Sequence, residues 1–294
     1  MSESEDWTIG KLLEWTKDYL AKHGAESPRL DAEVLLAHAR KCQRIELYTA
    51  FEEVANDQLR NEFRALVKKR SEGTPVAYLV ESREFYSLPF TVSPAVLIPR
   101  PETELLVVRL LDLAKERNVA STEDAQLKVV DVGTGSGIIA ICSAIYLPSA
   151  RIVAIDASEA ALEVAKANAK RHNVSDRIEF RHGDLLEGVD EQFDFIVSNP
   201  PYVSEAEYAE LDKSVRDHEP REALVGGSSG TELISKLVAQ SGSLLRSKGW
   251  FLMEISPMIA DSVKRIVDSN PAFSSVRVTP DLAKLPRIVE TQRQ

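Results

Sequence analysis

The stretch Asp131-Val132-Gly133-Thr134-Gly135-Ser136-Gly137 stands directly behind an apolar run that begins at Leu127. Its glycines allow a tight turn and a close approach of the backbone to a ligand, and a helix that begins after the turn offers unpaired N–H groups. Taken alone, the turn is compatible with a methyl-donor site, a dinucleotide site or tight packing of a strand against a helix. The residues around it have to decide between these alternatives.

Strand-like and helix-like segments alternate from this turn to the end of the chain. Apolar runs with flanking turn residues predict the strands, and amphipathic segments between them predict helices. The predicted strands are 127–132, 151–155, 177–181, 193–198, 250–255 and two closing strands near Val276 and Val289. We therefore predict an α/β fold with a seven-stranded, doubly wound, Rossmann-like sheet.

The segment before the sheet has a different pattern. Apolar side chains recur at helical spacing from Thr8 to about Val80, which predicts a small all-helical bundle. Aromatic and β-branched residues around Ser87-Leu88-Pro89 predict a linking β-hairpin. The predicted domains are a helical bundle at 1–80, a hairpin linker at 81–96 and a catalytic domain at 97–294.

Two local predictions concern the start of the second domain. Pro101 is expected in the first turn of the helix that carries Leu105 and Leu106, because proline is tolerated there. The polar stretch 118–126 is expected to be a surface loop.

Composition limits the classes of function. The chain has 294 residues, 44% hydrophobic content and a formal net charge of −10, which suits a globular protein and opposes nonspecific attraction to phosphate. Residues 1–6 are acidic and polar, so we expect neither a secretory nor a transit signal there, and no apolar stretch reaches membrane-spanning length. The two cysteines and five histidines show no metal-ligand spacing. We expect a cytoplasmic protein without metal, membrane contact or direct nucleic-acid binding.

Residues at the ends of the next two predicted strands complete a candidate cofactor site. Asp156 ends the second strand, where a carboxylate in this topology accepts both ribose hydroxyl protons, although capping of the following helix is the alternative. Asp184 and Leu185 follow the third strand, where one polar and one apolar contact could hold an adenine ring, with an ordinary loop turn as the alternative. The predicted cofactor contacts are Gly133, Thr134, Gly135, Ser136, Gly137, Asp156, Asp184, Leu185 and Asn199.

The tetrapeptide Asn199-Pro200-Pro201-Tyr202 follows the fourth predicted strand. Its prolines lack N–H groups, so it cannot continue a sheet ladder and exposes carbonyl oxygens beside one side-chain amide. The side-chain oxygen of Asn199 and the carbonyl of Pro200 can each accept one N–H of a planar NH2 group, and Tyr202 can stack on that group. This arrangement favours methyl transfer to a planar nitrogen, whereas the alternative interpretation is a loop-starting turn.

These motifs resemble the amino-group methyltransferases that use S-adenosylmethionine, a family marked by Asn/Asp-Pro-Pro-Tyr/Phe after the fourth strand. Finer features are similar to the HemK/PrmC release-factor glutamine methyltransferases, and the resemblance covers nearly the whole chain. The segments that carry it are 97–104, Asn199–Tyr202, Glu219-Pro220-Arg221-Glu222-Ala223-Leu224, Gly226-Gly227, Asp281-Leu282-Ala283 and Pro286-Arg287.

The resemblance implies N5-methylation of the glutamine in the Gly-Gly-Gln loop of class I peptide-chain release factors, with S-adenosylhomocysteine as the second product. It implies that the cofactor contacts fall on 133–137, Asp156 and Asn199, that the adenine-side contact falls on Leu185, and that the glutamine is received by residues 199–202. Asn199, Pro200 and Tyr202 would be catalytic, and Pro201 would add to the substrate site. The helical bundle would dock the release factor.

The chain departs from the family pattern in two places. It has Ser256-Pro257-Met258 where the family commonly has glycine followed shortly by glutamine, and Val80-Glu81 where glycine is common before the hairpin. Two rival functions stay open: amino-group methylation of a nucleic-acid base at adenine N6 or guanine N2, and a noncatalytic module that binds a partner through its helices.

Overall fold

The computed structural model describes residues 6–120 and 126–294, and they form two compact units. The first unit comprises the described residues up to Ser82 together with Lys213–His218, and the second comprises Arg83–Asp212 and Glu219–Gln294. The segment Lys213–His218 therefore groups with the helical unit, although it lies far along the chain.

The regular structure of the first unit is mainly helical in the described residues, with one isolated β-bridge between Thr8 and Val54. The hydroxyl oxygen of Thr8 accepts a hydrogen bond from the backbone of Lys11, and the side chain of Asn56 accepts one from Leu59, so each residue caps the helix that follows it. The apolar faces of the helices meet in a core that includes Leu35. Its helices are α1 (Ile9–Lys22), α2 (Pro28–Arg40), α3 (Arg44–Thr49), α4 (Asp57–Ser71), α5 (Val76–Leu79) and α10 (Lys213–Arg216).

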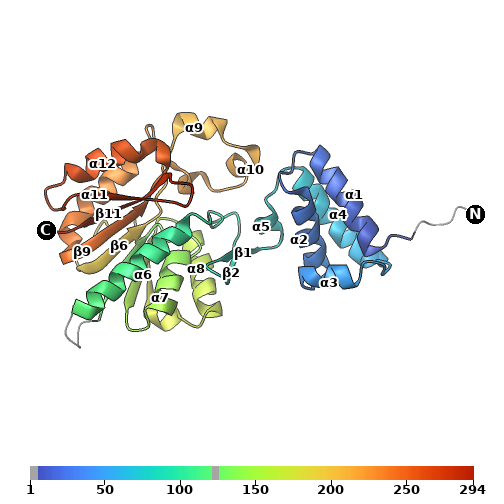
Figure 1. Cartoon of the computed structure of the whole chain (residues 1–294), viewed down its shortest axis with the longest axis horizontal. Helices are drawn as coiled ribbons and strands as arrows, with labels where there is room; N and C mark the ends of the chain where they lie inside the picture. The colour runs from blue at the N-terminus through green and yellow to red at the C-terminus, as the bar shows by residue number, and fades with distance from the viewer. Residues whose placement is uncertain (1–5, 121–125) are drawn as a thin grey trace, which may run out of the picture. The chain divides into compact units, whose positions relative to one another are not determined.

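A seven-stranded sheet forms the centre of the second unit, as the sequence predicts (Figure 1). The strands are β3 (Lys128–Val132), β4 (Arg151–Asp156), β5 (Ile178–His182), β6 (Phe193–Ser198), β9 (Leu245–Glu254), β10 (Arg277–Pro280) and β11 (Pro286–Gln292). Their order is β10-β11-β9-β6-β3-β4-β5, and β11 alone runs against the others. The predicted Rossmann-like α/β class is confirmed.

Helices cover both faces of this sheet. Val129 packs with the helices of one face and Val130 with those of the other, because successive side chains of a strand point to opposite sides. Figure 1 shows α6, α7 and α8 on one side and α11 and α12 on the other. These helices are α6 (Thr103–Ala120), α7 (Ile138–Tyr146), α8 (Glu159–Arg171), α11 (Glu232–Leu244) and α12 (Ala260–Asp268). In the described parts of the chain, no helix has the length and apolar character that crossing a bilayer requires.

A β-hairpin precedes α6. It consists of β1 (Ser82–Phe85) and β2 (Leu88–Thr91), and Phe85 and Phe90 are buried in the core beside α6 and α7. The buried side chain of Asn168 on α8 exchanges hydrogen bonds with the backbone of Thr91 and donates to the carbonyl of Ser136. One amide thus ties β2 to the glycine turn.

Local predictions failed in two places at the edges of α6. Pro101 lies in a turn before the helix, which begins at Thr103, since the carbonyl of Arg100 accepts the N–H of Thr103 across that turn. The helix continues to Ala120 and so enters the predicted loop at 118–126, of which 121–125 lie outside the described residues.

Periodicity also missed a small sheet after β6. It pairs β7 (Val203–Ser204) with β8 (Val225–Gly227), and α9 (Glu205–Glu210) follows β7. Such short strands carry too few residues for an alternating pattern to be visible in a sequence.

Candidate active site

A cavity of about 600 Å³ opens at the carboxyl ends of the central parallel strands. The loops that follow β3, β4, β5 and β6 all contribute to its wall, which is where open α/β sheets bind ligands. The sequence-predicted residues that line it are Gly133, Thr134, Gly135, Ser136, Asp156, Asp184, Leu185, Asn199 and Pro201. Gly137, Pro200 and Tyr202 are not among the lining residues.

The glycines of the turn have two different environments. Gly133 and Gly135 adopt φ angles of +73° and +55°, and a Cβ built on either would meet no atom within 4 Å in the described part of the chain. A Cβ on Gly137 would instead lie 3.0 Å from Ile141 and 3.1 Å from Ala165. The first two glycines therefore keep space open for a ligand, whereas Gly137 permits packing of the turn against α7 and α8.

Asp156 hydrogen-bonds two backbone N–H groups beside the cavity, and α8 is capped by the side chain of Ser158 rather than by Asp156. One carboxylate oxygen accepts the N–H of Gly135 at 2.8 Å and the other accepts the N–H of Ser158 at 2.9 Å. Burial raises the pKa of this carboxyl, and the hydrogen bonds from Gly135 and Ser158 act in the opposite direction. Since two carboxylate oxygens offer about four acceptor sites, the group retains capacity for hydroxyl donors.

Asp131, at the start of the glycine turn, is a buried acid that sequence reasoning left without a role. Its Oδ2 accepts hydrogen bonds from the Thr134 hydroxyl at 2.6 Å and the Ala140 N–H at 3.1 Å, whereas Oδ1 has no hydrogen-bond partner among the described residues. Burial raises the pKa of this carboxyl to about 7. Because Thr134 lines the cavity, Asp131 lies one side chain behind its wall, where a cationic ligand would compensate the buried charge.

The predicted adenine-side pair also lines the cavity. The carboxylate of Asp184 accepts a hydrogen bond from Nζ of Lys236 at 2.6 Å, so it is already engaged in an exposed ion pair. Leu185 adopts a φ angle of +55°, which is uncommon for a side chain of this kind. Of the two, Leu185 offers the free apolar surface.

Asn199 lines the cavity, and its side-chain amide is hydrogen-bonded to a residue outside the tetrapeptide. Its Nδ2 donates to the hydroxyl oxygen of Thr103 at 3.2 Å. Tyr202 packs partly buried against the core on the side of α11 and α12, and burial, with a further contribution from the charge of Glu254, raises its pKa to about 12. The phenol therefore stays neutral and cannot act as a general base near neutral pH.

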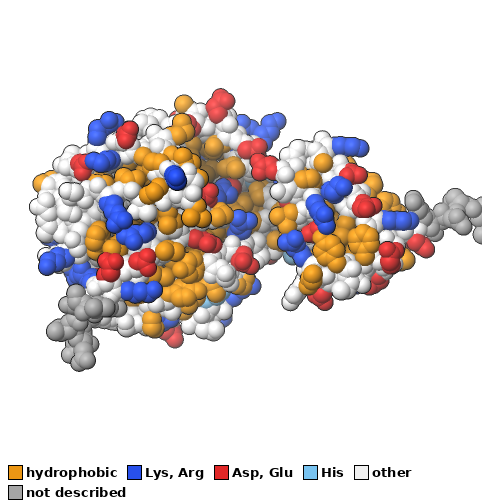
Figure 2. All heavy atoms as spheres, viewed as in Figure 1, with side chains coloured by type: hydrophobic (Ala, Val, Ile, Leu, Met, Phe, Trp, Pro, Cys, Tyr) orange, Lys and Arg blue, Asp and Glu red, His pale blue; other side chains and the backbone are white. Residues whose placement is uncertain are grey.

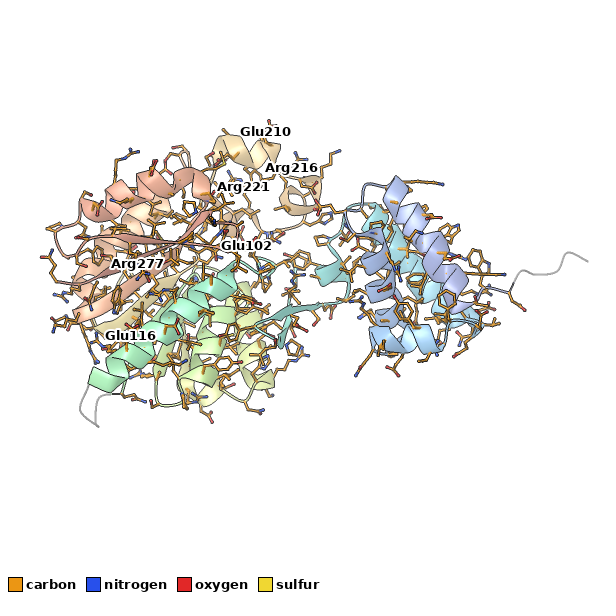
Figure 3. The ribbon with its side chains drawn as sticks, viewed as in Figure 1. Glu102, Glu116, Glu210, Arg216, Arg221 and Arg277 are labelled. Atoms are coloured by element: carbon orange, nitrogen blue, oxygen red, sulfur yellow. The ribbon has the colours of Figure 1, made fainter. Side chains whose placement is uncertain are left out.

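The loop at 95–102 forms a wall that the sequence showed only through the family resemblance. Ala95, Val96, Leu97, Pro99, Arg100 and Thr103 line the cavity. Arg100 donates to the carboxylate of Glu219 at 2.6 Å, and the other carboxylate oxygen accepts the N–H of Ile98 at 3.1 Å. The loop ends at Glu102, labelled in Figure 3, just before α6. An ion pair between a partly exposed arginine and a buried carboxylate thus joins two motifs that are 119 residues apart.

Gly226 on β8 supports the tetrapeptide after β6. A Cβ at this position would lie 2.4 Å from the carbonyl oxygen of Pro201 and 2.8 Å from that of Gly230. Real Cβ atoms do not approach oxygen so closely, so only glycine lets β8 pack against residues 199–202.

The sheet order, the glycine turn and the cavity define the class of the protein as a Rossmann-like methyltransferase. A solved structure of the hMettl16 catalytic domain in complex with a MAT2A 3'UTR hairpin superposes with a TM-score of 0.57 at 16% identity, over 78% of this chain and 81% of that chain. At this identity the similarity shows the fold alone.

Sequence comparisons identify the family. Residues 11–80 match the model of the PrmC N-terminal domain, and 109–215 match that of the methyltransferase small domain. The chain is 47% identical to the release factor glutamine methyltransferase of Rhodopirellula baltica, over 99% of this chain and 98% of that protein. It is 40% identical to that of Koribacter versatilis, over 96% and 97%. The chain belongs to the release factor glutamine methyltransferase family.

Proposed function

We propose that this enzyme transfers a methyl group from S-adenosylmethionine to the side-chain amide nitrogen, N5, of the glutamine in the Gly-Gly-Gln loop of class I release factors. The observation that carries the proposal is one cavity lined by both the glycine turn and Asn199. A methyl donor on the turn and an amide on Asn199 would share this space. Because release factors act on ribosomes, the reaction is placed in the cytoplasm.

The residues present fit the donor. Gly133 and Gly135 leave room for its methionine part, and Asp156 has acceptor capacity for ribose hydroxyls. Oδ1 of Asp131, which has no partner among the described residues, suits a nearby ammonium group. Leu185 would contact the adenine ring. The donor supplies an electrophilic methyl on a sulfonium, whose S–C bond breaks as the new N–C bond forms.

The substrate amide would be held by oxygen atoms. Oδ1 of Asn199 would accept one of its N–H groups, and the carbonyl of Pro200, a residue that does not line the cavity, is proposed to accept the other, so that the face of the nitrogen is presented to the methyl group. The nitrogen becomes acidic as the N–C bond forms, and it releases its proton late, to water. The donor, having lost its methyl group, becomes S-adenosylhomocysteine. No strong base is needed, which agrees with the neutral state of Tyr202. Tyr202 would support residues 199–201 from the side of the core, and Pro201 lies in the cavity wall.

Intact-mass measurement tests this function. A purified class I release factor incubated with the enzyme and S-adenosylmethionine should gain the mass of one methyl group, and peptide mapping should place it on the Gly-Gly-Gln glutamine. A release factor in which that glutamine is replaced by alanine should gain no mass. Methyl incorporation that persists in this substrate variant would refute the assignment.

Base methylation is the competing function. The net charge of −10 disfavours a nucleic-acid surface, and Figure 2 shows acidic and basic side chains interspersed over the described residues of the face in view. Labelled donor offered with release factor, tRNA or DNA in parallel should give label in the release factor alone. A noncatalytic binding module would label none of them.

The helical unit is proposed to dock the release factor. It has its own groove of about 270 Å³, lined by the aromatic residues Trp7, Trp15, Tyr19 and Phe63, the basic residues Arg60, Arg64 and Lys68, and Leu12, Thr16 and Val67. We call this the helical-unit groove. Trp15 remains 51% exposed although it stacks on Tyr19 at 4.9 Å. Exposed aromatic and basic side chains are frequent in protein interfaces, and they suit a partner surface with apolar and acidic residues.

A further inference from the structure

A short chain of hydrogen bonds runs from Asn199 into the interior of the second unit. Nδ2 of Asn199 donates to the hydroxyl oxygen of Thr103 at 3.2 Å, and the Thr103 side chain is hydrogen-bonded to the carboxyl group of Glu254. Thr103 is 0% exposed and Glu254 is 1% exposed. The three residues come from the end of β6, the first residue of α6 and the last residue of β9, so their meeting depends on the fold.

The hydroxyl proton of Thr103 sets the direction of these hydrogen bonds. A threonine hydroxyl has a single proton to donate, and an ionised carboxylate can only accept. When Thr103 donates to Glu254, its oxygen has only lone pairs left for Asn199. Asn199 must then turn its NH2 group towards Thr103, which leaves Oδ1 facing the cavity that Asn199 lines.

We propose that Thr103 and Glu254 are positioning residues, which hold the Asn199 amide with its oxygen towards the substrate. The proposal rests on the proposed function, in which this oxygen accepts an N–H of the target glutamine. If the amide turned over, Nδ2 would face the N–H groups of the substrate, and two donors would oppose each other. We call the hydrogen-bonded series Glu254–Thr103–Asn199 the relay. It turns the Asn199 oxygen towards the cavity before the substrate arrives, so that the side chain does not have to reorient during the reaction.

The surroundings of Glu254 make its charge sensitive to pH. Burial raises the pKa of this carboxyl to about 7, and Glu102 adds to that effect, whereas the Thr103 hydrogen bond and the charges of Arg287 and Arg100 act in the opposite direction. Tyr202, whose pKa is raised by burial and in part by the charge of Glu254, is a further titratable neighbour. Oε2 of Glu254 has no hydrogen-bond partner in the described part of the chain, and the carboxyl group is hydrogen-bonded to the side chain of Thr103. A protonated Glu254 would no longer require the proton of Thr103.

Substitutions of Thr103 test the relay directly. Thr103→Val keeps the shape of the side chain but removes the hydroxyl, and we expect kcat for the release factor to fall at least tenfold. The KM for the release factor and the Kd for S-adenosylmethionine, measured by calorimetry, should stay within twofold. Thr103→Ser restores the hydroxyl and should return kcat to within threefold of the wild-type value.

The sheet offers a matched control. Thr279 on β10 donates to the buried carboxylate of Glu290 at 3.0 Å, so it repeats the threonine–glutamate pair away from the cavity lining. Thr279→Val should leave kcat unchanged. A similar loss of kcat in both valine variants would mean that disturbance of the sheet, and not the relay, causes the effect, and would overturn the proposal.

Glu254→Gln gives a second readout, which also decides the question if Thr103→Val does not fold. With S-adenosylmethionine saturating, wild-type kcat should rise as pH increases through about 7, where Glu254 ionises, and the variant should lose that rise and be slower at pH 8. Wild-type kcat at pH 8 in Glu254→Gln would overturn the relay. If the relay tests fail but Asn199→Ala still loses most of its kcat, the proposed function stands without the relay. If Asn199→Ala keeps its activity, the proposed role of Asn199 itself is refuted.

Discussion

The catalytic cavity and the helical-unit groove differ in where their charged side chains lie. The catalytic cavity is backed by the buried acids Asp131 and Glu254, whose pKa values burial raises to about 7. The basic side chains of the helical-unit groove lie at its surface beside exposed Trp15. Buried charges are sensitive to small changes in geometry, whereas exposed charges mainly affect association. We therefore expect cavity variants to change kcat and groove variants to change KM for the protein substrate.

The largest effect is expected at Asn199. Asn199→Ala removes the proposed side-chain acceptor, and we expect kcat to fall about a hundredfold or more, as when one preorganised polar contact to a transition state is lost. Steady-state kinetics with release factor and labelled donor measure the loss. Asn61, exposed on α4, provides the control, since Asn61→Ala should keep wild-type kcat. A change under threefold in Asn199→Ala would contradict its catalytic assignment.

Gly226 should give the next largest effect. In Gly226→Ala the new Cβ would lie 2.4 Å from the carbonyl oxygen of Pro201, so β8 or the tetrapeptide has to move. Displacement of a reacting group by a fraction of an ångström is costly, and we expect kcat to fall about tenfold or more. Gly24 is a control for backbone strain without collision. Its φ is +79°, and a Cβ built on it would meet no atom within 4 Å in the described residues. Gly24→Ala should lower the melting temperature without lowering kcat.

The sequence predicted those parts of the site that depend on local pattern. The glycine turn and Asp156 follow predicted strands directly, so topology alone brings them to one edge of the sheet. The contact of Thr103 with Asn199 joins residues 96 positions apart, and the pair Arg100–Glu219 joins residues 119 apart. No periodicity encodes such long-range pairs, because they depend on where α6 begins above the sheet. Gly226 was recognised only as part of a motif, since the collision it avoids exists only in three dimensions.

The buried acids predict a pH dependence of stability. The pKa of Asp131 is raised from 3.8 and that of Glu254 from 4.5, both to about 7, so the folded protein binds more protons than the unfolded chain between these values. Their contribution to stability is fully present below their ordinary pKa values and is lost as pH rises through about 7. Without methyl donor, the melting temperature should fall by roughly several degrees between about pH 5 and pH 8.

Asp131→Asn tests the origin of this fall. An asparagine keeps an acceptor oxygen for Thr134 and Ala140 but does not ionise, so the decrease in melting temperature with pH should become smaller. Asp176→Asn, at an exposed position, should keep the wild-type decrease. Equal pH dependence in the wild type and Asp131→Asn would show that Asp131 does not carry the effect.

The smallest effect is expected in the helical-unit groove. Trp15→Ala removes an exposed ring that stacks on Tyr19 and meets Trp7 edge-on at 6.4 Å, and we expect KM for the whole release factor to rise about fivefold, the equivalent of about 1 kcal/mol. Values of kcat should not change, because the cavity is intact. Ile45→Ala removes an even more exposed apolar side chain of the same unit, outside the groove, and should leave KM unchanged.

A short Gly-Gly-Gln peptide separates docking from chemistry in the same variant. The peptide lacks the rest of the release factor, which is the part proposed to contact the groove, so Trp15→Ala should leave its KM at the wild-type value while KM for the whole protein rises. An equal rise for peptide and protein would mean that the substitution acts through the cavity, and the assignment of recognition to one region and chemistry to the other would fail. Weak dependence of the protein KM on salt would likewise exclude the groove cations Arg60, Arg64 and Lys68 as the source of docking affinity, because exposed charges are screened by salt.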